Sequence, residues 1–204
     1  MRKCSRDRDT IARAEEQVKP EIRYQVYRRT DSRLFTIALQ LVQYATEIKK
    51  PDGERLAQFH DANLQSLKFQ MLSPAPITVD TEKLFMKAAL NLGQEKLGKD
   101  DAYVQAVLHG GAVDSTVDSL IDGTKLNDVA VRKQLMDGGE AVIAASTDPM
   151  IQAARRVDPI LRASQRKMRE TVASVLTPAG EKLGKADSSC TERMRIPTPP
   201  LRYV

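Results

Sequence analysis

The segment Leu120–Pro159 constrains the fold more than any other part of the sequence, because helix-terminating and helix-capping residues follow one another in it at short intervals. Gly123 should end one helix and Gly138-Gly139 the next, since glycine accepts the backbone conformations found at helix C-termini. Ser146-Thr147-Asp148 then precedes Pro149, an order typical of an N-cap followed by proline in the first helical turn. The segment therefore predicts a series of short helices joined by tight turns.

The same segment contains polar residues for which the sequence predicts specific partners. Asn127 or Asp128 should cap the helix that follows, because a short polar side chain can accept a hydrogen bond from a free N–H group of the first turn. Arg132, Arg155 and Arg156 are expected to form ion pairs with the nearby acidic residues. None of these features is by itself a catalytic motif.

The spacing of apolar residues is helical along nearly the whole chain, and no alternating run is long enough to indicate a sheet. Only 4% of the 204 residues are aromatic and Trp is absent, which also favours helices. We therefore predict an all-α fold, an irregular multi-helix domain. The expected helices cover residues 11–18, 21–28, about 31–48, 61–72, 81–97, 101–109, 115–121, 128–136, 140–145 and 149–176.

Several helix boundaries can be predicted in more detail. Thr30 or Asp31 should cap the strongly amphipathic helix that contains the apolar residues from Leu34 to Ile48. Asp80 is the expected cap of the helix that begins at about residue 81. Pro159 should bend or split the last long helix, because proline removes one backbone hydrogen bond and crowds the preceding turn.

The charge distribution argues against nucleic-acid binding. Of the net charge of +5, residues 1–8 carry +3 and residues 187–204 carry +1, so the body of the chain is almost neutral. A nucleic-acid-binding protein usually concentrates basic residues on a folded face. We therefore expect no nucleic-acid partner.

Composition also limits location and cofactors. No apolar run approaches the roughly 18 residues of a membrane span, and the N-terminal residues lack the apolar core of a signal peptide, so the chain as written would stay in the cytoplasm. Cys4 and Cys190 lie far apart in the sequence and form neither a disulfide framework nor a metal motif. We expect no metal site and no cofactor.

Three features resemble functional motifs but have simpler structural interpretations. His60 and His109 are the only histidines, and each lies at an expected helix end, where histidine is common for structural reasons. The stretch Gly93–Asp100 nearly matches a phosphate-binding loop, but Asp100 stands where a Ser or Thr is needed and the stretch ends a helix when it should begin one. We interpret it as a helix stop, and we assign no catalytic residue.

Three stretches together resemble peptidase family S46, the bacterial serine exopeptidases of the dipeptidyl-peptidase 7/11 type. They are KPEIRYQVYRRTDSRLFTIALQLVQYATEIKKPDGERL, then DGTKL, LMDGGEA and ASTDPMI with AARRVDP, and finally SVLTPAGEKLGKA. The resemblance covers residues 8–186. It implies a chymotrypsin-like double β-barrel with a Ser-His-Asp triad and an inserted helical domain that caps the active site, so that dipeptides are released from free N-termini.

Within that scheme the chain corresponds to the later part of the helical domain. The resemblance places the triad His and Asp before this part and the nucleophilic Ser after it, so the 204 residues are expected to be inactive alone and their substrate-binding residues are unknown. It further implies peptide substrates, a homodimer, and a periplasmic or cell-envelope location for the intact enzyme. The alternative hypothesis is a free-standing helical module that binds partner proteins in grooves between helices.

The resemblance divides the chain into three parts. Residues 1–8 form a non-native or disordered start, residues 9–186 a partial helical cap domain, and residues 187–204 a polar, proline-rich tail. Codons can be chosen for the tail so that a shifted frame encodes FVVYGADAYPDATFTLR, which is similar to the family sequence and alternates like a strand. We therefore expect a disordered tail or a frameshift at this point, and sequencing the gene distinguishes the two.

Overall fold

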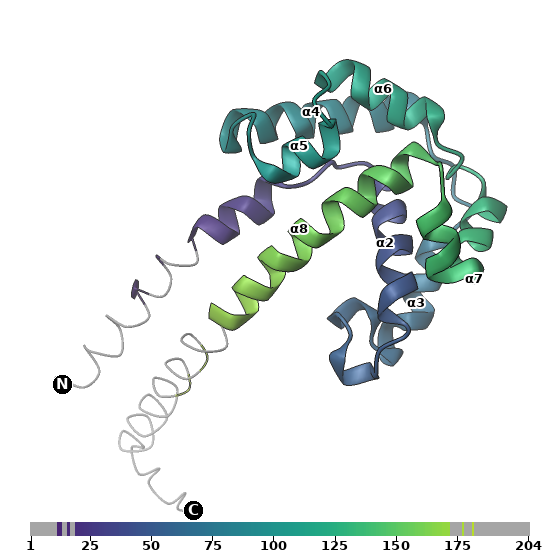
Figure 1. Ribbon diagram of the computed structural model, residues 1–204, viewed down its shortest axis with the longest axis horizontal. Coiled ribbons are helices and arrows are strands. Elements are labelled where there is room, and N and C mark those ends of the chain that lie inside the picture. The colour runs from purple at the N-terminus through teal and green to yellow at the C-terminus, as the bar shows by residue number, and fades with distance from the viewer. Residues whose placement is uncertain (1–11, 14–15, 17–18, 172–176, 178–180, 182–204) are drawn as a thin grey trace, which may run out of the picture. The chain divides into compact units, whose positions relative to one another are not determined.

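The computed structural model describes residues 12–13, 16, 19–171, 177 and 181. It divides into two compact units, Tyr24–Ala163 and a second unit formed by Met1–Arg23 and Ser164–Val204. Every regular element in the described ranges is a helix, and none of these residues is in a β-strand (Figure 1). The prediction of an all-α fold is confirmed. Cys4 and Cys190 lie outside the described residues, as do the N-terminal start and the tail that were expected to be atypical.

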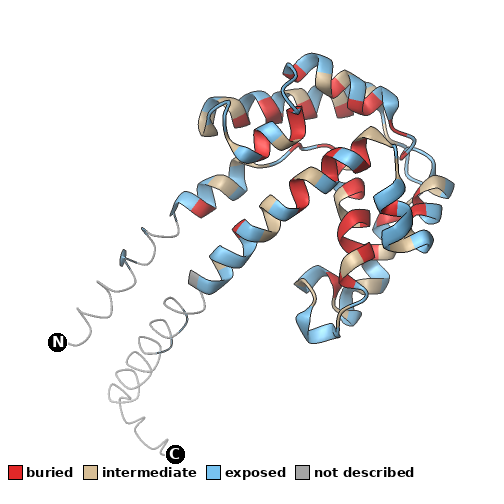
Figure 2. Cartoon of the chain, in the orientation of Figure 1, coloured by how far each residue is buried: buried red, intermediate tan, exposed pale blue. Residues whose placement is uncertain are grey.

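The larger unit contains most of the helices, and they pack in two main groups. α2 packs mainly against α7 and also against α3, while α4 packs against α6 and α5 (Figure 1). Apolar residues on the facing sides of these helices form the core, and Figure 2 shows them buried. The elements are α2 (Arg33–Glu47), η1 (Asp52–Glu54), η2 (Ala57–Phe59), α3 (Asp61–Met71), α4 (Val79–Leu97), α5 (Ala102–Leu108), α6 (Val113–Gly123), α7 (Val129–Ala145) and α8 (Pro149–Thr171), which continues into the second unit.

Two of the predicted helix caps are wrong. Ser32 caps α2 in place of Thr30 or Asp31, and its Oγ accepts a hydrogen bond from the Phe35 amide at 3.1 Å. α4 begins at Val79, so Asp80 lies inside the first turn, where its carboxylate can still interact favourably with the helix dipole. In both cases the helix starts within two residues of the expected position.

Glu82 on α4 shows how packing determines the start of α2. Its buried carboxylate accepts hydrogen bonds from Ser32 Oγ at 2.6 Å and from the Leu34 amide at 3.1 Å. The first N–H groups of a helix have no partner within the helix, and here a side chain from a distant helix accepts one of them. Ser32 Oγ therefore accepts a hydrogen bond from Phe35 and donates one to Glu82, and these two bonds hold it in the capping position.

Pro159 does not split the last helix. α8 continues through it from Pro149 to Thr171, so of the predicted bend or split only the split is excluded. The residues before the proline are fixed by tertiary contacts, because Val157 is fully buried and Asp158 accepts a hydrogen bond from Gln43 Nε2 at 2.8 Å. These contacts stabilise the helical turn before Pro159, where the proline removes a backbone hydrogen bond.

A buried carboxylate at the C-terminal end of α2 joins three segments of the larger unit. Glu47 is fully buried and accepts hydrogen bonds from Lys50 Nζ at 2.5 Å, from the Leu56 amide at 2.7 Å and from Arg162 Nη1. Arg162 also donates to Asp158 at 2.7 Å, and the hydrogen bonds that Arg162 donates to the two carboxylates raise its pKa although burial lowers it. Burial alone would raise the pKa of Glu47, but its three hydrogen bonds together lower the pKa below its usual value.

This lowered pKa predicts a contribution of Glu47 to pH-dependent stability. A carboxyl group whose pKa is lower in the folded state stabilises the fold above its unfolded pKa, and this stabilisation is lost as the pH falls through the folded value. Glu47→Gln should therefore reduce the free energy of unfolding by about 1.5–2 kcal/mol at pH 7. Below about pH 4.5, the free energy of unfolding should fall less steeply with pH in this variant than in the wild type. Denaturant titrations from pH 3 to pH 7 measure both effects.

Glu54→Gln provides the matched control for this prediction, because Glu54 is exposed and lies only a few residues away. It should leave the unfolding free energy within about 0.5 kcal/mol of the wild type. An unchanged pH profile in Glu47→Gln would contradict the assignment of this effect to Glu47.

The second unit is described in residues 12–13, 16, 19–23, 164–171, 177 and 181. Glu21 is buried there, and its carboxylate accepts hydrogen bonds from Ser164 Oγ at 2.8 Å and from Lys167 Nζ at 2.6 Å. These bonds join the helical segment that contains residues 19–23 to the C-terminal part of α8. The prediction of a helix over residues 21–28 is largely confirmed, since residues 19–27 are helical.

Candidate binding pocket

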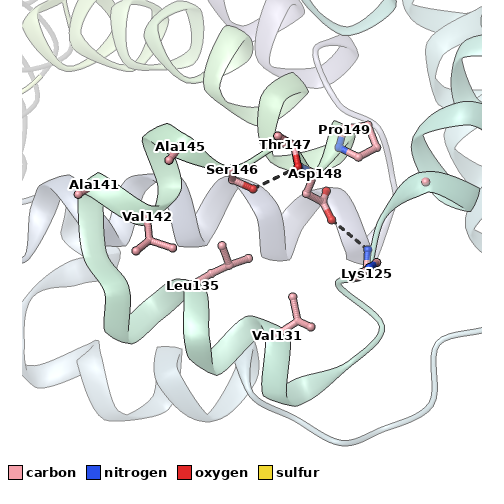
Figure 3. A pocket seen from close by; sticks show the side chains of 11 residues that line it. Lys125, Val131, Leu135, Ala141, Val142, Ala145, Ser146, Thr147, Asp148 and Pro149 are labelled. Atoms are coloured by element: carbon pink, nitrogen blue, oxygen red, sulfur yellow. Dashed lines mark hydrogen bonds between the residues drawn. The ribbon is translucent and has the colours of Figure 1, made fainter.

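A pocket of about 550 Å³ lies in the larger unit between the two halves of α7 and the start of α8 (Figure 3). Its walls are mainly apolar, and polar groups are confined to the loops at either end of α7. All of the lining residues belong to the segment Leu120–Pro159 that the sequence singled out. They are Gly123, Lys125, Val131, Leu135, Ala141, Val142, Ala145, Ser146, Thr147, Asp148 and Pro149.

The pocket exists because α7 is kinked at Gly139. This residue has φ 63° and ψ −155°, a combination that only glycine adopts without strain, and a Cβ built on it would contact nothing within 4 Å. The backbone conformation, and not the available space, therefore requires glycine here. The prediction that Gly138-Gly139 interrupts the helix is confirmed, and the interruption places Leu135 and Val142 on the walls of one cavity (Figure 3).

The adjacent Gly138 is required for a different reason. A Cβ at Gly138 would lie 2.5 Å from Val142 Cγ2 and 2.7 Å from Val142 Cβ, which is closer than real atoms approach. The side chain of Val142 therefore packs directly over this glycine. Together the two glycines allow the second half of α7 to return across the first.

Asp148 fixes the polar end of the pocket. One carboxylate oxygen accepts hydrogen bonds from the amides of Met150 at 2.9 Å and Ile151 at 3.3 Å, which confirms that the Ser146-Thr147-Asp148 stretch caps α8. The other oxygen accepts from Thr124 Oγ1 at 2.9 Å and from the Lys125 amide at 2.9 Å, and Figure 3 shows the bond from Lys125. Asp148 thus ties the loop after α6 to the start of α8, and its hydrogen-bonding capacity is used within the protein.

Gly123 permits the close approach of these two segments. A Cβ at this position would lie 2.9 Å from Pro149 Cγ, so any larger residue would push the end of α6 away from α8. The predicted helix stop is confirmed, because α6 ends at Gly123. The glycine therefore ends the helix and also makes room for the proline beside the pocket.

Arg132 is buried beneath the turn that precedes α7. Its guanidinium donates to the carbonyl oxygens of Leu126 and of Asn127, the latter at 3.2 Å. It also donates to Met71 O at 3.3 Å, at the end of α3, and to Ser73 O at 3.0 Å, just after that helix. Burial lowers the pKa of Arg132, because the charged form loses hydration, and nearby Arg33 lowers it further. One side chain thus connects two loops that are about 60 residues apart in the sequence.

The predicted ion pairs of the three arginines are wrong. Arg132 contacts four carbonyl oxygens, Arg155 donates to Ala144 O and Arg156 to Ala106 O, each of the last two at 2.8 Å. Ala144 and Ala106 lie in the last turns of α7 and α5, where carbonyl groups lack helical partners and attract cations. The carboxylates of Asp128 and Asp148 are meanwhile occupied by helix N-termini. These three arginines therefore bind backbone carbonyl groups, whereas Asp128 and Asp148 bind helix N-termini.

Neither histidine forms a catalytic arrangement in the part of the chain that the structure describes. His60 Nδ1 lies 3.3 Å from Asp52 Oδ2 at the start of α3, and His109 follows α5 in a left-handed conformation with φ 49°. Neither ring is hydrogen-bonded to a serine among these residues. A Ser-His-Asp triad needs the histidine between both partners, so these contacts favour the structural interpretation of both residues.

The remaining motif is also a structural feature. Gly93 lies inside α4 and is buried, and a Cβ there would be 3.2 Å from Tyr27 O, while Gly98 follows the helix with φ 96°. A phosphate-binding loop would precede a helix, so the interpretation of Gly93–Asp100 as a helix stop is confirmed. Among the described residues, no group of His, Cys, Asp and Glu has the arrangement of a metal site, and no helix is long and apolar enough to cross a membrane.

Sequence reasoning named no binding residue, and the pocket shows why. Leu135 and Val142 each resemble ordinary core residues of a helix, and Lys125 resembles a surface lysine. The two consecutive glycines were the available signal, because a break at that point makes two short helices face each other. The sequence alone did not show that they enclose a cavity.

Comparison with known proteins shows to which family the sequence belongs. The sequence matches the family Peptidase S46 over residues 4–198, which is most of the chain and extends beyond the resemblance at both ends. No match was found among curated proteins. The family is one of peptidases, so the relatives of this chain hydrolyse peptide bonds. The chain belongs to peptidase family S46.

Proposed function

We propose that these 204 residues form part of a serine dipeptidyl-peptidase, in which they shape the active-site cleft and limit access to it. The observation that carries the proposal is the family match over residues 4–198 in a chain whose described elements are all helical. A helical cap restricts which peptides reach the catalytic groups, so that dipeptides are released from free N-termini. Peptides are accordingly the proposed substrates of the intact enzyme.

The proposal assigns the chemistry to a chymotrypsin-like barrel outside these residues. Peptide hydrolysis by a serine enzyme needs a nucleophile, a histidine base and an acid that orients the base. The contacts of His60 with Asp52 and the position of His109 at a helix end support a structural role for both. We propose that the chain alone has no hydrolytic activity.

Three further features belong to this proposal. The intact enzyme is expected to act in the periplasm or cell envelope and to form a homodimer. Residues 9–186 are proposed to be the helical cap, with residues 1–8 non-native or disordered and residues 187–204 disordered or read in a shifted frame. The family match extends to residue 198, so the gene sequence around residue 187 is the decisive observation for the tail.

Activity measurements test the proposed function. The purified chain should show no turnover of dipeptidyl-arylamide substrates and no covalent labelling by a serine-directed fluorophosphonate. Substituting residues 9–186 for the corresponding part of an active S46 peptidase should give a chimera that releases dipeptides, because the catalytic groups lie in the retained barrel. Turnover by the isolated chain that the fluorophosphonate abolishes would contradict the proposal, and so would a correctly folded chimera whose products are not dipeptides.

A further inference from the structure

The pocket between the two halves of α7 and the start of α8 has the size and the walls of a small-ligand site. Its volume of about 550 Å³ lies within the range of about 300–1,000 Å³ that is typical of such sites. Leu135 lines it from the first half of α7 and Val142 from the second (Figure 3), and Val142 remains 38% exposed although it is apolar. The pocket therefore leaves apolar surface that a ligand can cover. The aliphatic side chains of the lining are Val131, Leu135, Ala141, Val142 and Ala145.

The lining contains one residue of each charge, and neither offers a buried partner to an ion. Lys125 is exposed, so water screens its charge. The Asp148 carboxylate accepts hydrogen bonds from the amides of Lys125, Met150 and Ile151 and from Thr124 Oγ1. It also lies at the positive N-terminal end of α8, which offsets its charge within the protein. An uncharged molecule therefore enters these apolar walls at the lowest desolvation cost.

A single hydroxyl at the edge of the pocket is available as a hydrogen-bond donor. Ser146 Oγ accepts a hydrogen bond from the Asp148 amide at 3.3 Å, and it forms no other hydrogen bond with the residues that the structure describes. Its O–H can therefore donate to a ligand. Apolar walls with a donor at one end suit a molecule that is apolar over most of its length and has one terminal acceptor.

We propose that this pocket binds an uncharged, mainly apolar small molecule with a single hydrogen-bond acceptor at one end, such as a ketone or an ester. The apolar part lies against Leu135 and Val142, and the acceptor receives a hydrogen bond from Ser146 Oγ. The inference rests on the pocket alone and does not depend on the proposed function.

A fluorescence titration with prodan tests the binding. Prodan is an uncharged naphthalene derivative with a ketone at one end, and its emission moves to shorter wavelength when it passes from water into an apolar site. Saturable binding with this emission shift is expected. Ser146→Ala should weaken the binding about two- to tenfold, because one hydrogen bond is lost. The matched control Ser115→Ala, at an exposed position of α6, should leave it unchanged.

Variants of the apolar wall assign the binding to this pocket. Val142→Asp should weaken prodan binding at least about tenfold, because it places a charge against the apolar ligand. Leu84→Asp is the matched control, since Leu84 is 66% exposed on α4 and does not line the pocket. Val142→Thr nearly keeps the shape of the side chain and should still weaken binding about threefold. Circular dichroism checks that all variants fold.

Two competitors of equal chain length test whether the ligand must be uncharged. Octanone should displace prodan, and octanoate should do so at least about tenfold more weakly, both in the wild type and in Lys125→Gln. Equal displacement by octanoate would overturn the inference, and its loss in Lys125→Gln would identify an anion site. The absence of saturable prodan binding, or equal binding by the wild type and both Val142 variants, would also overturn it.

Discussion

Replacing Arg132 by methionine should lower the free energy of unfolding by about 3–5 kcal/mol, the largest effect that we expect from a single substitution in this chain. The guanidinium is only 1% exposed and binds four carbonyl oxygens, of Met71, Ser73, Leu126 and Asn127. Methionine fills most of the volume but donates no hydrogen bond, so buried carbonyl groups lose their partner. Urea denaturation measures the difference.

Arg155→Met is the matched control for this substitution. Arg155 is exposed and donates to one carbonyl oxygen, Ala144 O, so its loss should change the unfolding free energy by less than about 1 kcal/mol. Arg132→Lys should be intermediate, because an ammonium group lacks the planar fork that reaches both loops. Equal stability of Arg132→Met and Arg155→Met would show that the four contacts do not stabilise the fold.

Gly139→Val should destabilise the protein by about 3 kcal/mol. The φ and ψ angles of Gly139, 63° and −155°, fall in a region that is almost exclusive to glycine, and a β-branched side chain raises the cost. No atom lies within 4 Å of the position that a Cβ would occupy, so the expected loss comes from backbone strain and not from a steric clash. Denaturant unfolding measures the effect.

Gly53→Val separates backbone strain from the general effect of removing a glycine. Gly53 also has nothing within 4 Å of a Cβ, but its φ does not lie in the left-handed region. The substitution should therefore lower the free energy of unfolding by less than about 1 kcal/mol. If both glycine variants were equally stable, the kink in α7 would not depend on Gly139.

The sequence predicted the positions of the helices well because local signals determine them. Gly123, Gly139 and Asp148 act through their own backbone conformation or through amides two or three residues away, so their effects are independent of the rest of the chain. The family resemblance was also carried by this local order, and the match over residues 4–198 confirmed it. These features needed no knowledge of tertiary contacts.

The errors concern residues whose partners lie far away in the sequence. Ser32 caps α2 because Glu82, 50 residues later, holds its hydroxyl, and nothing near Ser32 indicates this. The sequence predicted that the three arginines pair with nearby acidic residues, because opposite charge is the only indication of their partners that a sequence contains. In the structure these three arginines bind carbonyl groups, and the carboxylates of Asp128 and Asp148 bind helix N-termini, because unpaired backbone groups compete successfully for both kinds of charge.

In the segment Leu120–Pro159, some features follow from the sequence alone and others only from the tertiary structure. By itself the sequence determined that this segment forms short helices with breaks at Gly123 and Gly139, since backbone preferences are properties of single residues and their neighbours. Only the tertiary structure decided that the break encloses a pocket, that Lys125 lies at its rim without an acidic partner among the described residues, and that Arg132 is buried among carbonyl groups. These outcomes depend on which surfaces meet when the helices pack, and packing joins residues that no local pattern connects.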